Sequence, residues 1–81
     1  MVSTKEHLKK ETIKWLNKLD NLDIKLKNPK KHGFLKNIKA YIKDSHYFTE
    51  KEDFVRAFEA VVWAWAWVEI GEQEGFLEIK K

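Results

Sequence analysis

Residues 53–75 read DFVRAFEAVVWAWAWVEIGEQEG, and this stretch decides the fold because its middle is apolar on every side of a helix. A helix that is apolar all round is normally covered by neighbouring elements rather than left half in water. Residues 54–74 are therefore predicted to form a helix that two other helices cover. On a helical wheel, the inward face is predicted to hold Phe54, Ala57, Phe58, Ala60, Val61, Val62, Ala64, Trp65 and Val68.

The opposite side of this helix carries charged residues together with two tryptophans. Trp63 and Trp67 lie one helical turn apart, with Ile70 beside them. Two covering helices cannot enclose a third on all sides, so this ridge is expected to be a contact surface, most simply in a homodimer. Alternatively, residues 76–79 fold back over Trp67 and Ile70, or a skewed first helix covers Trp63. The predicted interface consists of Arg56, Glu59, Trp63, Trp67 and Ile70.

Two more segments have the apolar spacing of helices. Ser3 and Glu6 match a capping box, in which each side chain accepts a hydrogen bond from a free backbone amide at the helix start. Apolar residues then recur every three or four positions as far as Leu26, which predicts a first helix over residues 3–27. The same period resumes at Phe34 and predicts a second helix over residues 34–51.

The connections between these helices have typical turn residues. Asn28 to Gly33 contains the only proline of the chain, and proline is unfavourable inside a helix. The second connection is short, and Asp53 can cap the helix that follows. Gly75 suits a C-terminal cap, and the apolar tail at residues 76–79 is expected to fold back onto the end of the bundle.

These elements predict an all-α fold, an up-down-up three-helix bundle, with residues 1–81 forming a single domain. Cysteine is absent, so the stability of so small a domain must come from apolar packing or association. The longest unbroken apolar run, residues 60–68, is far shorter than the ~20 residues that cross a bilayer. The charged N-terminus does not resemble a signal peptide. A soluble, cytoplasmic protein is expected.

Charge is distributed unevenly along the chain. Residues 1–43 contain twelve lysines and four acidic residues, a net charge of +8, whereas residues 44–81 have a net charge of −5. A basic surface can bind RNA or DNA, although lysine-rich solvated helix faces are common in other proteins. The leading expectation is a non-enzymatic protein-interaction or structural module that uses the aromatic side of the third helix. An RNA-associated accessory protein is the alternative function. Its predicted contacts are Lys30, Lys31, Lys36, Lys39 and Lys43.

The sequence offers little chemistry for catalysis or metal binding. The chain has no cysteine, and the histidines at positions 7, 32 and 46 lie on different predicted elements. Metal sites built from histidines on one helix place them three or four residues apart, which this chain does not do. Glu69 and Glu72 are the pair of carboxylates that comes closest to a metal-binding motif. Such a pair at the end of a helix is normally just exposed to solvent. We therefore expect no enzyme activity, no bound metal and no cofactor.

The C-terminal half resembles an uncharacterised family of short archaeal helical proteins, the domain of unknown function 357. The family pattern has the form Y-x-x-D-A-x-x-F, a turn, and D-Y-V-x-A-F-E-A-x-x-Y-A-W-G-W. This chain departs from it at Glu52, where the family has glycine, at Ser45 and at Trp63. The resemblance implies a compact helical fold and an archaeal, cytoplasmic origin, and it implies no activity. The coinciding positions are Tyr41, Asp44, Phe48, Asp53, Phe54, Val55, Ala57, Phe58, Glu59, Ala60, Ala64, Trp65 and Trp67.

Overall fold

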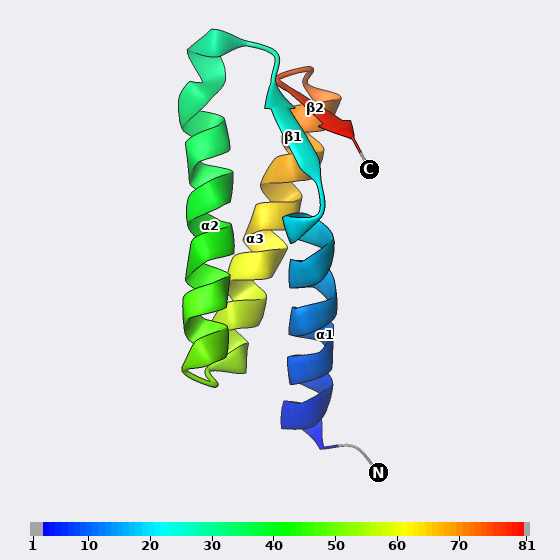
Figure 1. Ribbon diagram of the computed structural model, residues 1–81, viewed down its shortest axis with the longest axis vertical. Helices are drawn as coiled ribbons and strands as arrows, with labels where there is room; N and C mark the ends of the chain where they lie inside the picture. Colours follow the sequence, from blue (N-terminus) through cyan, green and yellow to red (C-terminus); the bar gives the residue numbers. More distant parts are fainter. Residues whose placement is uncertain (1–2, 81) are drawn as a thin grey trace.

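The computed structural model describes residues 3–80, and most of them are helical (Figure 1). The elements are α1 (Thr4–Asp20), β1 (Asp23–Leu26), a short 3-10 helix η1 (Pro29–Lys31), α2 (His32–Glu50), α3 (Phe54–Gln73) and β2 (Leu77–Lys80). In Figure 1, α1 and α3 run in one direction and α2 runs in the other. The chain is thus mostly helical, as predicted, with a small two-stranded sheet added. No helix among residues 3–80 is long and apolar enough to cross a membrane.

The prediction that the first helix continues to Lys27 is wrong. The helix begins as predicted, with the Ser3 hydroxyl accepting a hydrogen bond from the Glu6 amide at 3.1 Å, but it ends at Asp20. Residues 23–26 form β1, which pairs antiparallel with β2 so that Ile24 lies opposite Ile79. A short segment with alternating burial satisfies a period of two as well as the three-four spacing of a helix. The tail, distant in sequence, supplies the strand partner that decides between them.

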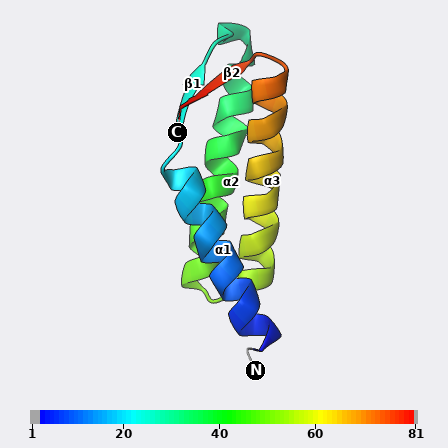
Figure 2. The same ribbon diagram turned by 90° about the vertical axis from the view of Figure 1, so that its right-hand side faces the viewer.

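Helices α2 and α3 form an antiparallel hairpin joined by residues 51–53. Asp53 caps α3 as predicted, accepting a hydrogen bond from the Arg56 amide at 3.3 Å. The buried Ser45 hydroxyl donates to the carbonyl of Ala57 across the hairpin at 2.8 Å. In Figure 2, α2 and α3 run alongside each other, while α1 crosses the pair obliquely. Consequently α1 covers only part of α3.

The buried face of α3 agrees with the predicted one at six of its seven residues and differs from it at the edge. Val62 was expected in the core but is 48% exposed, whereas its neighbour Val61 is 1% exposed. Phe58 and Trp65 are only half-buried. Along the middle of α3, small residues face the core because they allow the closest approach of the neighbouring helix, and the rings of Phe58 and Trp65 lie at the flank. The buried residues of α3 are Phe54, Ala57, Ala60, Val61, Ala64, Val68 and Gly71.

The apolar tail folds back onto the end of the bundle, as predicted, and does so as a strand. Gly75 adopts a φ of 76°, a left-handed conformation that favours glycine, and this reverses the chain after α3. The Phe76 amide then donates to the carbonyl of Gly71 at 2.8 Å. Leu77 is 2% exposed and packs with Leu19 of α1 and Val68 of α3. The tail therefore completes the core.

Candidate functional site

The side of α3 that faces away from the core exposes large apolar residues. Trp63 is 57% exposed, Val62 48% and Ile70 47%. Ala66, one turn from Val62 and one turn from Ile70, is half-buried and connects them. We refer to Val62, Trp63, Ala66 and Ile70 as the α3 surface. Several half-exposed apolar residues on one helix are more than the scattered single residues that any protein surface carries.

The five residues of the predicted interface do not share one exposed ridge. Arg56 and Glu59 are exposed, and Arg56 lies 3.6 Å from the Asp53 carboxylate. Trp63 is exposed and stacks on Tyr41 of α2, with ring centroids 6.4 Å apart. These three residues and Ile70 remain accessible. Trp67, described next, does not lie with them.

Trp67 is half-buried against α2. Its ring meets that of Phe34 edge-to-face, with centroids 4.6 Å apart, and Phe34 meets Phe76 at 5.5 Å. The first turn of α2 thus covers Trp67, in a cluster to which the tail contributes through Phe76. The alternative in which the tail covers Ile70 as well is wrong, because nearly half of that side chain is exposed.

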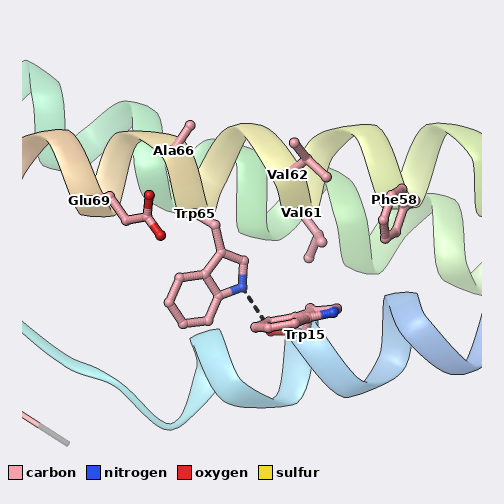
Figure 3. A pocket seen from close by; sticks show the side chains of 7 residues that line it. All are labelled: Trp15, Phe58, Val61, Val62, Trp65, Ala66 and Glu69. Atoms are coloured by element: carbon pink, nitrogen blue, oxygen red, sulfur yellow. Dashed lines mark hydrogen bonds between the residues drawn. The ribbon is translucent and has the colours of Figure 1, made fainter.

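A groove between α1 and α3 adjoins the α3 surface (Figure 3). It has a volume of about 440 Å³. The rings of Trp15 and Trp65 meet in it at nearly a right angle, with centroids 5.7 Å apart. Glu69 lies beside Trp65 at one end, as Figure 3 shows. The lining residues are Trp15, Phe58, Val61, Val62, Trp65, Ala66 and Glu69.

Both indole N–H groups in this groove have partners inside the protein. Trp65 Nε1 donates to the carbonyl of Trp15 at 3.3 Å, and Trp15 Nε1 donates to the Glu11 carboxylate at 3.0 Å. The rings are therefore fixed, and they present mainly carbon to the groove. Such a groove suits the apolar side of another molecule better than a polar ligand. Sequence reasoning missed it because Trp65 was assigned to the inward face of its helix.

Charged side chains of both signs flank Trp15 on α1, where the Glu11 carboxylate accepts from its indole and two lysines lie near its ring. On α1, the Lys18 ammonium lies 4.4 Å from the centroid of the Trp15 ring, and that of Lys14 lies 5.5 Å from it. On α3, the Glu69 carboxylate lines the groove. Among residues 3–80 the ion pairs are His46 with Asp20 and Arg56 with Asp53, so Lys14, Lys18 and Glu69 have no ionic partner within 4.0 Å. Their pairing capacity is unused in the isolated chain.

The five lysines of the predicted nucleic-acid contact are all exposed. Lys36, Lys39 and Lys43 follow one side of α2, at the spacing that places residues together on a helix. Lys30 and Lys31 lie on η1, and the Lys31 ammonium is 4.8 Å from the centroid of Phe76. RNA binding by this basic side stays a prediction.

The polar side chains most able to carry chemistry are engaged within the fold. No group of three or more His, Asp or Glu residues among positions 3–80 could hold a metal ion. The Ser45 hydroxyl is buried and bonded to the Ala57 carbonyl. His46 Nε2 lies 2.9 Å from the Asp20 carboxylate, a link between α2 and α1. These polar side chains thus join elements of the fold.

Comparisons with known proteins show the family to which the chain belongs. The family model of a protein of unknown function, DUF357, matches residues 5–77, so the chain belongs to this family. It is also similar to a crystal structure, that of protein AF1782 from Archaeoglobus fulgidus, with 48% identity and a TM-score of 0.82. That match covers 96% of this chain and 100% of the other.

The family match extends further than the sequence resemblance indicated. The resemblance was placed in the C-terminal half, which is wrong, because the matched residues also include nearly all of α1 and β1. The N-terminal half, rich in lysine and short of distinctive aromatic spacing, gave no recognisable pattern by itself. The search among curated proteins finds no match.

Proposed function

We propose that this chain is a non-enzymatic protein-interaction module of the archaeal cytoplasm, built on an up-down-up bundle of three helices, whose third helix binds a protein partner. The observation that carries the proposal is the half-exposed state of Val62, Trp63 and Ile70 on one helix. Tryptophan is enriched at the centres of protein interfaces, where it supplies a large apolar area. Self-association is the simplest form of this function.

The surroundings of the α3 surface support the same conclusion. The surface is continuous with the groove through Val62 and Ala66, which belong to both. Arg56 and Glu59 lie exposed on the same helix and can supply a polar rim. An apolar centre with charged edges is the usual composition of a protein interface, and it differs from a deep pocket with several converging polar groups.

The test replaces Val62 and Trp63 together by glutamate. Both side chains are about half exposed, so the double variant should fold, as helical circular dichroism can verify. We expect the parent to self-associate at micromolar concentration in sedimentation equilibrium. The double variant should sediment as a monomer of about 9.7 kDa. Tyr47→Glu is the matched control, because Tyr47 is 54% exposed on α2, and it should associate like the parent.

If the parent is monomeric, the partner to be sought is a different protein. A photo-reactive amino acid at position 62 should then cross-link a protein in an archaeal extract. Trp63→Glu should abolish the cross-link and Tyr47→Glu should preserve it. A parent that neither self-associates nor gives a cross-link with this dependence would contradict the proposed function.

A further inference from the structure

The segment from Ile24 to Lys43 is uniformly basic. It contains seven lysines and no aspartate or glutamate, and all seven lysines are exposed. Among residues 3–80 the two ion pairs are those of His46 and Arg56, so none of these lysines has a described carboxylate within 4.0 Å. Helix α1 differs, because its five lysines are interspersed with three acidic residues. Positive charge without a partner is therefore concentrated along β1, η1 and α2.

Three of these lysines form a row on α2. Lys36, Lys39 and Lys43 are three and four residues apart, which places them on one side of the helix, roughly opposite its buried residues. We refer to them as the lysine row. Lys43 lies seven residues beyond Lys36, which is about 10 Å along the helix. Lys30 and Lys31 on η1 extend the basic surface beyond the start of α2.

We propose that the lysine row, together with Lys30 and Lys31, binds the phosphate backbone of a double-stranded nucleic acid independently of its base sequence. This function is additional to the proposed protein interaction and uses a different helix. One strand of a duplex carries one phosphate per ~3.4 Å of helix axis, and so about three phosphates over the length of the row. The row and a strand of that length therefore carry equal and opposite charge.

The residue types on α2 indicate which partner fits. A lysine ammonium is a point charge that binds phosphate, whereas base sequence is read mainly by side chains with bidentate groups, arginine above all. The one arginine of the chain, Arg56, lies on α3 beside Asp53. A membrane surface fits less well, since a membrane-bound helix places large apolar side chains beside its basic ones. Of the large apolar residues of α2, only Tyr47 is exposed.

The stability of the fold does not explain this arrangement of charge. Like charges one turn apart on a helix repel each other, and those of the lysine row are placed in this way. The N-cap of α2 is Lys31, and the first turn of the helix has no acidic residue, which is unfavourable with respect to the helix dipole. A bound phosphate backbone would relieve both repulsions.

The experiment measures binding of a fluorescein-labelled DNA duplex by fluorescence anisotropy. The parent should bind with a dissociation constant in the micromolar range or lower at low salt. The triple variant Lys36→Gln, Lys39→Gln, Lys43→Gln should raise that constant about tenfold or more, because three phosphate contacts are lost. The slope of log affinity against log salt concentration should become shallower by about 2–3 for the same reason.

A charge-matched control replaces Lys5, Lys9 and Lys10 of α1 by glutamine. These lysines are also exposed, and the change in net charge is the same. The control should therefore raise the dissociation constant by less than about threefold, since it removes only the long-range part of the attraction. Equal losses in the two triple variants would mean that net charge, and not the lysine row, holds the duplex.

Competition with the labelled duplex defines the partner. An unlabelled duplex of unrelated sequence should compete as well as the same duplex does. A single strand of the same length should compete less well, because it has half the phosphates, and polyglutamate of equal charge should compete poorly. The proposal is overturned if the parent fails to bind at low salt, prefers one sequence or the single strand, or releases the duplex equally to polyglutamate.

Discussion

At the scale of the residue, Glu52 is the clearest departure from local preference. Its φ is 58°, in the left-handed region that residues with a Cβ rarely adopt, and it lies in the turn between α2 and α3. The family resemblance has glycine at this position, and the backbone conformation supplies the reason. The capped start of α3 and the packed hairpin around the turn hold the strained conformation in place.

Glu52→Gly should stabilise the protein by about 0.5–1 kcal/mol. The left-handed conformation costs a residue with a Cβ about 1–2 kcal/mol, and the greater freedom of glycine in the unfolded chain offsets part of the relief. The midpoint of urea unfolding should rise accordingly. Lys51→Gly is the control, because the φ of Lys51 is −82° and no strain is relieved. A lower midpoint for Glu52→Gly than for the parent would contradict this explanation.

At the scale of the element, α3 shows which residues become buried when a helix is apolar on all sides. The helical wheel predicted one inward face that held Val62 and Trp65 together with three alanines and Val61. The structure buries those alanines and Val61, as predicted, but leaves Val62 about half exposed. An antiparallel neighbour packs most closely against small side chains. The large side chains then occupy the flanks, where Trp65 meets α1 and Trp63 meets α2.

The adjacent valines at 61 and 62 provide a matched test of this face. Val61 is 1% exposed, so Val61→Ala should leave a small cavity and cost about 2 kcal/mol in the free energy of unfolding. Val62 is 48% exposed, so Val62→Ala should change it by no more than about 0.5 kcal/mol in the monomer. Urea unfolding at low protein concentration measures both. Equal losses for the two variants would mean that the face is assigned incorrectly.

At the scale of the whole molecule, the two chain halves meet at the end of the bundle, where β2 pairs with β1 and Leu77 enters the core. Gly71 of α3 makes this possible. A Cβ added there would lie 2.7 Å from Leu77 Cγ and 2.9 Å from Phe34 Cε1, and closer still to Leu77 Cδ1. The absent side chain thus makes room for the tail and for the start of α2. Helix preference alone would count a glycine at this position as destabilising.

Gly71→Ala should therefore destabilise the protein although alanine favours helices. Overpacking a filled site costs about 1–3 kcal/mol, which exceeds the helix preference of alanine over glycine, about 1 kcal/mol. Gly33→Ala is the control, because a Cβ at Gly33 in α2 meets nothing within 4 Å. That variant should be as stable as the parent or more so. Thermal melts of the two variants should move in opposite directions, and a higher melting temperature for Gly71→Ala would refute the close approach.

The candidate site was only partly accessible from the sequence. The wheel correctly placed Trp63 and Ile70 on the outside of α3, because charges at Arg56 and Glu59 mark the solvated side of that helix. It could not place Trp67, whose burial depends on Phe34 from another helix. The groove could not be predicted either, because it depends on how two helices are placed. It exists only where the oblique path of α1 leaves Trp15 and Trp65 partly uncovered.

The sequence by itself determined the three helices, the Ser3 and Asp53 caps, and the return of the apolar tail. The helices and caps depend on residues within a few positions of one another, so local chemistry suffices, whereas the return of the tail was indicated by its apolar composition. Only the tertiary structure decided that residues 23–26 form a strand, that Val62 lies outside the core, and where the groove opens. These features depend on contacts between residues far apart in the chain, and the free energy of those contacts outweighs a local pattern that permits two solutions.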